Sequence, residues 1–538
     1  MTLRYLSLSA EEAPWSRSGG LAEVAGSLPK ALAAHWAREE REVEVWSVSP
    51  LYPSAWREVA RRGLRLREGP HVPLAPLSYE SAQLWYLSID SDPSDESSVS
   101  RGHLFVDLPA AFDRDALYGP SGGAYEDNPL RFAALSLTAI RVPEAFEEWL
   151  AGLHERIPAL HFTSGVTDHL LHCHDWQAAF APLLLQRGWA RTQFKTVFTI
   201  HNLRHQGLAA ARWVPLLGLS WDDFHFDRLE HWGHFNPLKG ALRAVDLVTT
   251  VSPTYAQEIF EPQFGCELDD YLNAHQLEVT GIVNGLDLDT WSPHKAPQLA
   301  QPLPSDPTDD ELTAWKRVHR EEVAPAIYQQ GEGSRTGPWG VMVSRFDAQK
   351  GVELVVECAP RWIARGVKLC ILGSGDPQLE AKIRALEARF PDAVKVYIGF
   401  DLRRAHQLFA AADFTLVPSR FEPCGLTQMQ SMRYGALPLA TRVGGLADTI
   451  HDISSRALRR DEVHEIDQLE DSAPSVIGDG FLATAPNVWA LDEAMERLLD
   501  VWSRPEVWCA ARRNALQRDL SWDERARTWS EVLVRLMS

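Results

Sequence analysis

Apolar residues recur along the chain in short runs, and each run is followed by a stretch whose apolar positions have helical spacing. Such runs predict buried β-strands, and the stretches between them predict amphipathic helices. Because the two alternate, the pattern predicts doubly wound parallel sheets of the α/β class. In the first half the predicted strands are LRYLSL (3–8), VEVWSV (43–48), HLFVDL (103–108), KTVFTI (195–200), DLVTTV (246–251) and EVTGIV (278–283).

A polar, proline-rich stretch, PHKAPQLAQPLPSDP (293–307), interrupts this alternation and predicts a crossing between domains. A second series of predicted strands follows: WGVMVS (339–344), VKLCILG (367–373), AVKVYIG (393–399), DFTLVP (413–418) and ALPLAT (436–441). The sequence therefore predicts two Rossmann-like domains, residues 1–292 and 293–515. Residues 516–538 are expected to form a C-terminal helix that packs back on the first domain.

Charge and composition narrow the possible functions. The 538 residues carry a formal net charge of −20, which argues against a general binder of nucleic acid or anionic membranes. An anionic ligand must then be met by a few local cations. The six cysteines have no CxxC pairing, the N-terminus has no basic leader, and no apolar run is long enough to span a membrane. We expect a soluble cytoplasmic protein.

Two polar stretches are expected to be surface excursions. They are SDPSDESSVSRG (91–102) and the acidic RRDEVHEIDQLEDSAPS (459–475).

The motif RSGGLAEV (17–24) stands at the predicted entrance of a helix. Gly19 and Gly20 precede an apolar stripe of helical spacing, and Arg17 adds a positive charge. Glycines there let an anion approach main-chain N–H groups at the helix N-terminus. The letters match neither GxGxxG nor GxxxxGK[ST], so they do not indicate a dinucleotide site or a P-loop. By itself the motif is equally compatible with a plain turn.

Three further motifs in the first half carry polar side chains. HCHDW (172–176) places two histidines on one face of a strand end, and two histidines without an evident third ligand do not predict a metal. TIHNLRHQG (199–207) offers His201 and Asn202 at the end of a strand, for sugar hydroxyls or for structural hydrogen bonds. NPLKG (236–240) is read as a loop. The tripeptides DSD (90–92) and DLD (287–289) resemble metal-binding DxD motifs, although solvated acids explain them better.

The second half carries more chemistry. SRFDAQKG (344–351) follows a strand and sets Arg345 and Lys350 in one loop, where both can face a single polyanion. PSRFEPCGLTQMQSMRYG (418–435) follows another strand, places Glu422 before Gly425 and continues as a helix. Two cations, helix entrances and one carboxylate suit stabilisation of a phosphate leaving group beside an acid that positions a sugar. The facing carboxylate pair of a glycosidase is not evident.

Taken together, PSRFEPCGLTQ, GSGDPQLE, SRFDAQKG, TIHNLRHQG, HCHDW, GIVNGLDLDTWSP and VGGLADTI resemble the bacterial glycogen synthase and plant starch synthase family. The resemblance implies the GT-B fold and transfer of glucose from ADP-glucose to the non-reducing end of an α-1,4-glucan, with retention of configuration. It implies no cofactor and no required metal, a glycogen-like acceptor, and a site in the cleft between the two domains. The oligomeric state stays open.

The resemblance also implies roles by position. The implied catalytic residues are Glu422, Lys350, Arg345, His201 and Asp175. The implied donor-binding residues are Arg17, Gly19, Gly20, Glu23, Tyr118, Asn202, Asn236, Phe400, Ser419, Cys424, Gly425, Leu426 and Thr427. In this interpretation Arg345 and Lys350 hold the diphosphate and Glu422 positions the transferred glucose. Phe400 lies against the adenine, while the sugar side is lined by Asp175, His201, Asn202 and Asn236.

The chain departs from the family's usual KTGGLADV, since Arg17, Ser18 and Glu23 replace lysine, threonine and aspartate. Arginine stays cationic but is a planar fork rather than a compact ammonium. Three alternatives remain open at this point: a UDP-glucose donor, a retaining GT-B enzyme with a small acceptor, and a degenerate glucan-binding protein.

Overall fold

A computed structural model of the chain describes residues 2–88, 99–120, 123–152, 162, 165–324, 337–453 and 478–538. The chain forms two compact units. Unit 1 comprises Met1–Gly285 with Trp522–Ser538, and unit 2 comprises Leu286–Ser521. The predicted boundary at 292 therefore lies beyond the observed one, and the predicted boundary at 515 falls inside a helix of unit 2. The acidic stretch 459–475 and the DSD motif (90–92) lie outside the described residues.

Unit 1 is built on a nine-stranded sheet in the order β12-β11-β7-β6-β1-β2-β5-β4-β3. All neighbouring pairs are parallel except β5–β4 and β4–β3, which are antiparallel. A small sheet, β8-β10-β9, is antiparallel. The strands of unit 1 are β1 (Leu3–Leu8), β2 (Val43–Pro50), β3 (Arg67–Pro73), β4 (Ser81–Ser88), β5 (Val99–Asp107), β6 (Asp168–His174), β7 (Lys195–Ile200), β8 (Ala209–Ala210), β9 (Glu230–His231), β10 (His234–Phe235), β11 (Leu247–Thr250) and β12 (Val279–Gly281).

Helices cover both faces of the large sheet of unit 1, because alternate residues of its central strands point to opposite sides. Tyr5 and Val45 join one buried cluster with α1 and α21, whereas Leu6 and Trp46 join another with α4. The helices of unit 1 are α1 (Gly20–Arg38), α2 (Pro53–Arg61), α3 (Pro109–Phe112), α4 (Asn128–Ala151), α5 (Asp175–Ala178), α6 (Phe180–Gln186), α7 (Trp213–Leu216), α8 (Pro237–Leu242), α9 (Pro253–Glu258), α10 (Asp269–Ala274) and α21 (Trp522–Met537).

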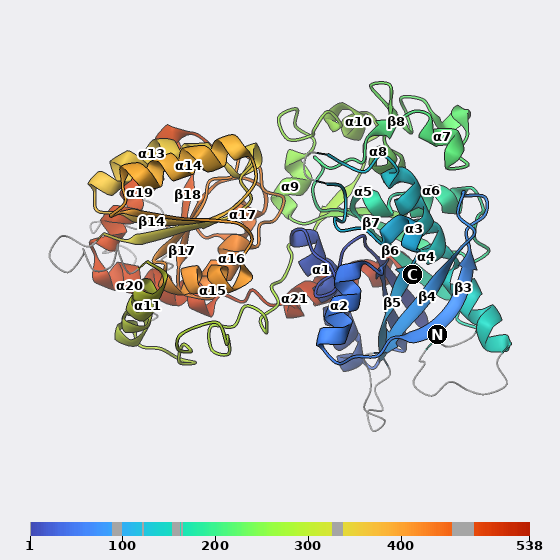
Figure 1. Cartoon of the computed structure of the whole chain (residues 1–538), viewed down its shortest axis with the longest axis horizontal. Coiled ribbons are helices and arrows are strands. Elements are labelled where there is room, and N and C mark those ends of the chain that lie inside the picture. The colour runs from blue at the N-terminus through green and yellow to red at the C-terminus, as the bar shows by residue number, and fades with distance from the viewer. Residues whose placement is uncertain are drawn as a thin grey trace, which may run out of the picture. The chain divides into compact units, whose positions relative to one another are not determined.

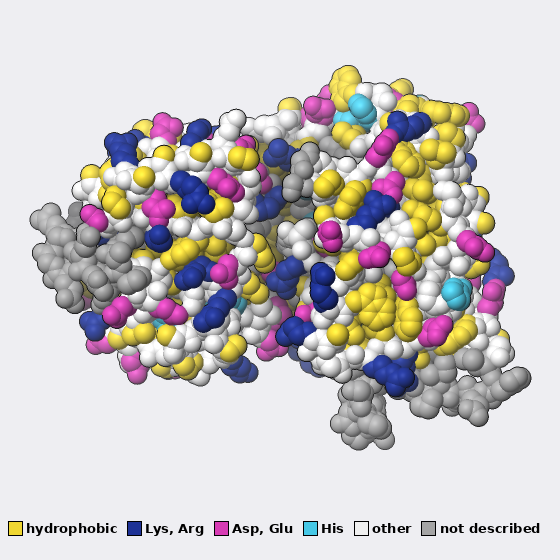
Figure 2. All heavy atoms as spheres, viewed as in Figure 1, with side chains coloured by type: hydrophobic (Ala, Val, Ile, Leu, Met, Phe, Trp, Pro, Cys, Tyr) yellow, Lys and Arg dark blue, Asp and Glu magenta, His cyan; other side chains and the backbone are white. Residues whose placement is uncertain are grey.

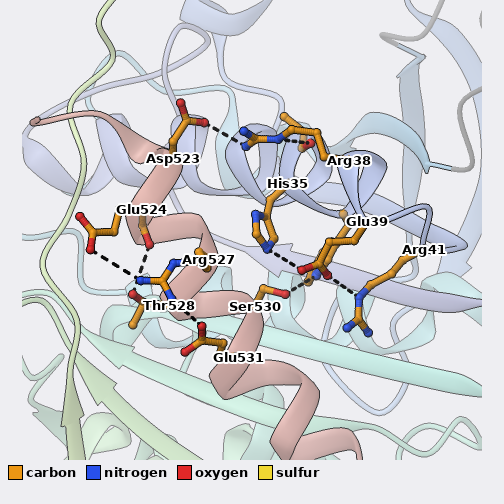
Figure 3. Close-up of polar contacts among 12 residues, drawn as sticks. His35, Arg38, Glu39, Arg41, Asp523, Glu524, Arg527, Thr528, Ser530 and Glu531 are labelled. Carbon is orange, nitrogen blue, oxygen red and sulfur yellow. Dashed lines mark hydrogen bonds and ion pairs between the residues drawn. The ribbon is translucent and has the colours of Figure 1, made fainter.

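The C-terminal helix α21 belongs to unit 1 because it packs along α1 (Figure 3). The Nε1–H of Trp36 donates to Ser530 Oγ at 2.9 Å, and Arg38 pairs with Asp523 at 3.0 Å. The Arg38–Asp523 pair is exposed and adds little, so the apolar side chains beneath hold the helix. They include Trp529, which is 2% exposed, and Trp522 on α21.

Unit 2 has a six-stranded, fully parallel sheet in the order β15-β14-β13-β16-β17-β18. Figure 1 shows α13 and α14 on one face of this sheet and α15, α16 and α20 on the other. Its strands are β13 (Trp339–Val343), β14 (Lys368–Gly373), β15 (Val394–Ile398), β16 (Phe414–Val417), β17 (Leu437–Thr441) and β18 (Phe481–Ala483). Its helices are α11 (Asp309–Val323), α13 (Val352–Ala364), α14 (Pro377–Arg389), α15 (Leu402–Ala411), α16 (Thr427–Met432), α17 (Gly444–Thr449), α19 (Val488–Trp502) and α20 (Pro505–Gln517).

The strand order of unit 2 has a functional consequence. Counted within the unit, it is the Rossmann order 3-2-1-4-5-6, in which the winding reverses between β13 and β16. Ligands of such sheets bind beyond the carboxyl ends of the strands at this switch point. In unit 1 the winding reverses between β1 and β6. The loops after these four strands are therefore where a site is expected.

The α/β fold class is confirmed, and each predicted strand coincides with or overlaps an observed one. The prediction of a purely parallel first sheet was incomplete because it lacked the antiparallel edge β4–β3. NPLKG (236–240) was wrongly read as a loop. Asn236 caps α8 and Pro237 is its first residue, and both are favourable signals for a helix start.

Candidate functional site

In unit 2, two loops meet at the switch point and hold each other in place. The loop 344–351 follows β13, and the loop 418–426 follows β16. The N–H of Arg420 donates to the carbonyl of Gln349 at 2.8 Å, and the Gln349 side chain donates to the carbonyl of Phe421 at 3.2 Å. Gly351 has φ +63°, and a Cβ there would lie 2.1 Å from the carbonyl oxygen of Pro418. Only glycine permits this approach of the two loops.

This contact places a lysine against a carboxylate. Lys350 Nζ lies 2.6 Å from Glu422 Oε2, and Ser419 Oγ donates to the same oxygen at 2.7 Å. Ser419 is fully buried and Glu422 is 6% exposed, so the carboxylate is held in a fixed orientation within a largely desolvated setting. The two motifs that the sequence singled out in the second half thus form one site.

A cavity of about 140 Å³ opens over this pair. Its lining includes most of the predicted residues of unit 2: Arg345, Lys350, Ser419, Glu422, Gly425, Leu426 and Thr427. Arg345 pairs with Asp347 at 3.4 Å, and 54% of its side chain is exposed, so its guanidinium can reorient toward an anion. One exposed cation, Arg345, and one held against a carboxylate, Lys350, therefore border the cavity.

Two other predicted residues of unit 2 lie outside that lining. Cys424 is buried, and its backbone packs so closely on Gly445 that a Cβ on the glycine would lie 2.3 Å from Cys424 Cα. Phe400 follows β15 and is 80% exposed. An aromatic ring with so little packing of its own is available to a flat ligand.

In unit 1, Glu11 organises the loop that carries the motif RSGGLAEV. Its carboxylate accepts hydrogen bonds from the Ser18 N–H, from Ser18 Oγ at 2.8 Å and from the Tyr118 hydroxyl at 3.0 Å. Burial raises the pKa of Glu11, whereas the hydrogen bonds from Ser18 oppose that rise. The sequence interpretation missed this residue, although a carboxylate directly after the first strand is the signal that could have found it.

The glycine loop itself stays open to solvent. Ser18, Gly19 and Gly20 are exposed, and a Cβ on Gly19 would meet no atom within 4 Å. The φ of Gly19 is −169°, a value that any residue adopts. Neither the packing of the described residues nor the backbone conformation therefore requires glycine at position 19. Arg17 is half-buried beside it, and Glu23 lies in the first turn of α1. This arrangement leaves main-chain N–H groups accessible to a ligand.

Asp175 stands at the end of β6, on the other side of the switch point of unit 1. Its φ is +58°, and its Oδ1 accepts the N–H groups of His201 at 2.7 Å and Asn202 at 3.4 Å. Burial raises the pKa of Asp175 to about 7, these hydrogen bonds lower it, and the nearby charge of Glu11 raises it further. The loops after β6 and β7 thus bring together three of the four predicted sugar-side residues, Asp175, His201 and Asn202.

His201 is oriented by a row of side chains across three strands. Its Nε2 lies 2.9 Å from His174 Nδ1, and His174 Nε2 lies 3.1 Å from Ser7 Oγ. His174 is fully buried. Burial lowers the pKa of His201 to about 3 and that of His174 well below its usual value, so both imidazoles are neutral near pH 7. Because Nε2 of His201 is engaged, its Nδ1 is the nitrogen left for a ligand.

Asn236 does not present its side chain to solvent. It is fully buried, its Oδ1 accepts the N–H of Lys239 at 2.9 Å, and its Nδ2 donates to Gln206 Oε1 at 2.6 Å. In this structure Asn236 supports the loop that carries His201 rather than lining an open surface. Lys239 is also structural, because its ammonium donates to the carbonyls of Phe226 and Glu230.

Among the described residues, no group of three or more His, Cys, Asp or Glu side chains could hold a metal ion. His172, paired in sequence with His174, is buried between Tyr5 and Thr199, with hydrogen bonds at 2.7 and 2.6 Å. In the DLD tripeptide, Asp287 caps the turn that follows it by accepting the N–H of Asp289 at 3.0 Å.

Side chains of opposite charge are mixed on the face of the protein that Figure 2 shows. Lys and Arg side chains are interspersed with Asp and Glu over the visible face of each unit (Figure 2). None of the helices that the structure describes is long and apolar enough to cross a lipid bilayer.

The chain was compared with protein-family models and with known proteins, and the matches cover both units. Residues 4–274 match the family model of the starch synthase catalytic domain, and residues 329–514 match that of glycosyl transferases group 1. A glycogen synthase from Anaeromyxobacter dehalogenans is 36% identical, with 100% of both chains covered. One from Cereibacter sphaeroides is 35% identical, with 99% of each chain covered.

A solved structure agrees as well. The catalytic domain of starch synthase IV from Arabidopsis thaliana, bound to ADP and acarbose, superposes with a TM-score of 0.75 at 26% identity, covering 99% of each chain. Two Rossmann-like units, each with polar residues at its switch point, and full-length relatives of one kind lead to a single assignment. The chain belongs to the glycogen synthase and starch synthase family, retaining glucosyltransferases of the GT-B fold.

Proposed function

We propose that this protein transfers glucose from ADP-glucose to the non-reducing end of an α-1,4-glucan, with retention of the α configuration. The observation that carries the proposal is the Lys350–Glu422–Ser419 cluster, which borders a cavity at the switch point of a Rossmann-ordered sheet. The full-length relatives named glycogen synthase and the starch synthase structure bound to ADP and acarbose support this choice of substrates.

Unit 2 binds the donor in this proposal. The diphosphate enters the cavity beside Arg345 and Lys350, whose positive charges are stronger stabilisers there than in bulk water. Glu422, held by Ser419, accepts hydrogen bonds from hydroxyls of the transferred glucose. The exposed ring of Phe400 lies against the adenine. These groups fix the glucose C1 while its bond to phosphate weakens.

The transfer step balances without a covalent enzyme intermediate. The bond between glucose C1 and the phosphate oxygen breaks, and a bond from C1 to the acceptor O4 forms on the same face. The 4-hydroxyl proton passes to the departing phosphate oxygen, and ADP leaves. Arg345 and Lys350 stabilise the negative charge that develops on the diphosphate, which is where catalytic stabilisation is largest.

Unit 1 contributes the sugar-side groups. In this proposal Asp175, His201 and Asn202 bind sugar hydroxyls. His201, whose Nε2 lies against His174, offers Nδ1 for this contact. Glu11 holds the loop whose accessible main chain and Arg17 contribute to donor binding. We propose that Arg17, Arg345 and Lys350, and no metal ion, balance the charge of the donor. We also propose that the enzyme acts in the cytoplasm.

A donor comparison tests the proposal. The protein is incubated with glycogen and either ADP-glucose or UDP-glucose, with and without EDTA, and chain elongation and the anomeric configuration of the new linkage are measured. We expect α-1,4 elongation with ADP-glucose that EDTA does not reduce. No elongation with either donor, under conditions where a glycogen synthase relative is active, contradicts the function. A low-molecular-weight glucoside as the only product contradicts the acceptor.

A further inference from the structure

Exposed hydrophobic side chains are concentrated in one segment of unit 1. Among the described residues, ten large hydrophobic side chains are exposed, and half of them lie between residues 208 and 232. These are Leu208, Leu216, Trp221, Phe226 and Trp232. Hydrophobic side chains also gather on the surface around α7 in Figure 2. Such a concentration on a soluble protein commonly marks a binding surface.

Trp232 is the most exposed of these side chains, at 77%, and its backbone conformation is unusual. It forms, with Gly233, the two-residue turn between β9 and β10, and the two residues have φ values of +50° and +79°. A hairpin turn with two positive φ angles favours Asn-Gly, because asparagine tolerates the left-handed region and bulky residues do not. A tryptophan there is costly for folding, and with 77% of it exposed, its T-shaped contact with the His231 ring, at 6.1 Å between centroids, offsets little of that cost.

The exposure is not caused by a loosely held hairpin. Phe235, next to the turn on β10, is fully buried in the core of unit 1 and contacts Phe180. The N–H of Gly233 donates to Glu230 Oε1 at 2.6 Å. The backbone is therefore firmly anchored, and the indole of Trp232 is presented to solvent by a rigid support.

The hairpin is connected to the sugar-side loop. Asn236 directly follows β10, and its Nδ2 donates to Gln206, which lies in the same loop as His201 and Asn202. Close to the turn, Glu267 lies 3.6 Å from His231, and 72% of the Glu267 side chain is exposed. An aromatic face beside an accessible carboxylate offers both kinds of contact that a sugar makes, through its C–H face and through its hydroxyls.

We propose that Trp232 is a stacking platform for the acceptor α-glucan, at which a glucose unit of the chain lies on the indole face. The inference rests on the proposed function, because that function makes a glucan the ligand of unit 1. A platform outside the reacting position adds affinity for longer chains through a second contact on the same ligand. Of the occupants that an exposed indole could have, the glucan is the one that the enzyme must hold.

The test uses the intact enzyme without donor and maltoheptaose as the probe. Trp232→Asn removes the ring and gives the turn its preferred Asn-Gly sequence, so folding should be unchanged or improved. We expect Trp232→Asn to weaken maltoheptaose binding by about tenfold, as measured by calorimetry, and Trp232→Phe to stay near the wild type. The matched control is Trp489→Ala, which removes a tryptophan of unit 2 that is 75% exposed, and binding should not change.

The outcomes are separable. Equal affinity of the wild type and Trp232→Asn for maltoheptaose overturns the proposal that Trp232 is a platform. An equal loss of affinity in Trp232→Phe and Trp232→Asn overturns it as well. A change in oligomeric state on size-exclusion chromatography with unaltered binding assigns the surface to a second copy of the chain and also overturns it. Because binding is measured without donor, absence of glucosyl transfer by the wild type counts against the proposed function alone.

Discussion

At the scale of single residues, folding separates side chains that the sequence cannot distinguish. Glu11 and Glu12 are adjacent carboxylates after the first strand. Glu12 lies 3.1 Å from His103 inside the sheet, whereas Glu11 turns to Ser18 and Tyr118 and supports the glycine loop. The motifs around Lys350 and Glu422 were predictable because each follows a strand and combines residues of one chemistry. The role of Glu11 was not predictable, because it depends on a contact with Tyr118, which is far away in the sequence.

Lys350 and Glu422 should be required for turnover rather than for folding. Lys350→Ala or Glu422→Gln is expected to lower kcat by at least about a hundredfold, because each group acts chiefly in the transition state. The control is Lys395→Ala, which breaks a partly exposed lysine–glutamate pair in the same unit, with 2.8 Å between Lys395 and Glu387. Initial rates of glucose transfer to glycogen measure the effect, and near-normal kcat in either site variant contradicts the assigned roles.

Asp175 should make stability depend on pH. Its pKa of about 7 in the folded state lies above the ordinary value of 3.8, so the folded protein holds an extra proton between these values. Raising the pH from about 4 to about 7 therefore destabilises the wild type relative to Asp175→Asn, by up to about 4 kcal/mol, with no further change above pH 7.

Asparagine can still accept both N–H groups and tolerates the positive φ of position 175. Urea unfolding of the wild type and of Asp175→Asn at a series of pH values measures the difference. A constant difference between the two proteins across this range would show that Asp175 ionises normally.

At the scale of elements, the predictable parts are those with a strong local pattern. Central strands such as WGVMV of β13 and FTLV of β16 are short, buried and largely apolar. The stripe after Gly20 forms α1, with Val24, Leu28 and Leu32 buried. β3, REGPHVP, has two prolines and a glycine and is a strand only because it pairs with β4. β8, β9 and β10 have two residues each and leave no periodic signal. Such elements are determined by long-range pairing.

The row Ser7–His174–His201 crosses β1, β6 and the end of β7, and it should orient His201. The Asn side chain can replace Nδ1 of histidine and the Gln side chain can replace Nε2. His174→Asn should keep the contact with His201, whereas His174→Gln should keep only that with Ser7. We expect kcat to fall by at least about tenfold in His174→Gln, since a small misplacement of a positioning group is costly, and to stay within about threefold in His174→Asn.

Long-range nitrogen–proton NMR of the imidazoles provides an independent measurement. His201 should keep one neutral tautomer in the wild type and in His174→Asn, but not in His174→Gln. Equal impairment of both variants, with His201 unaltered in the spectra, would reduce His174 to a packing residue.

At the scale of the whole molecule, the chain passes between its two compact units twice. The N–H of Leu286 donates to the carbonyl of Leu520 at 2.7 Å, and a Cβ on Gly285 would lie 2.6 Å from Trp522 Cγ. The two passages therefore lie side by side. The predicted boundary at 292 followed the proline-rich composition, whereas the observed one follows this pairing. The last helix, α21, completes the core of the first unit.

Two compact units, each with buried apolar side chains of its own, predict two unfolding transitions. Trp529 on α21 packs in unit 1 with its ring 4.9 Å from that of His172, and Trp315 packs in unit 2; each is 2% exposed. Replacement of either by alanine should cost about 3–5 kcal/mol and lower one transition by roughly 10 °C in calorimetry. Under the proposed function ADP is a ligand of unit 2, so it should raise the melting temperature of that unit's transition and thereby identify it. Trp315→Ala should lower only the transition that ADP raises, and Trp529→Ala should lower only the transition of unit 1. A single transition that both substitutions lower equally would mean that the two units unfold as one.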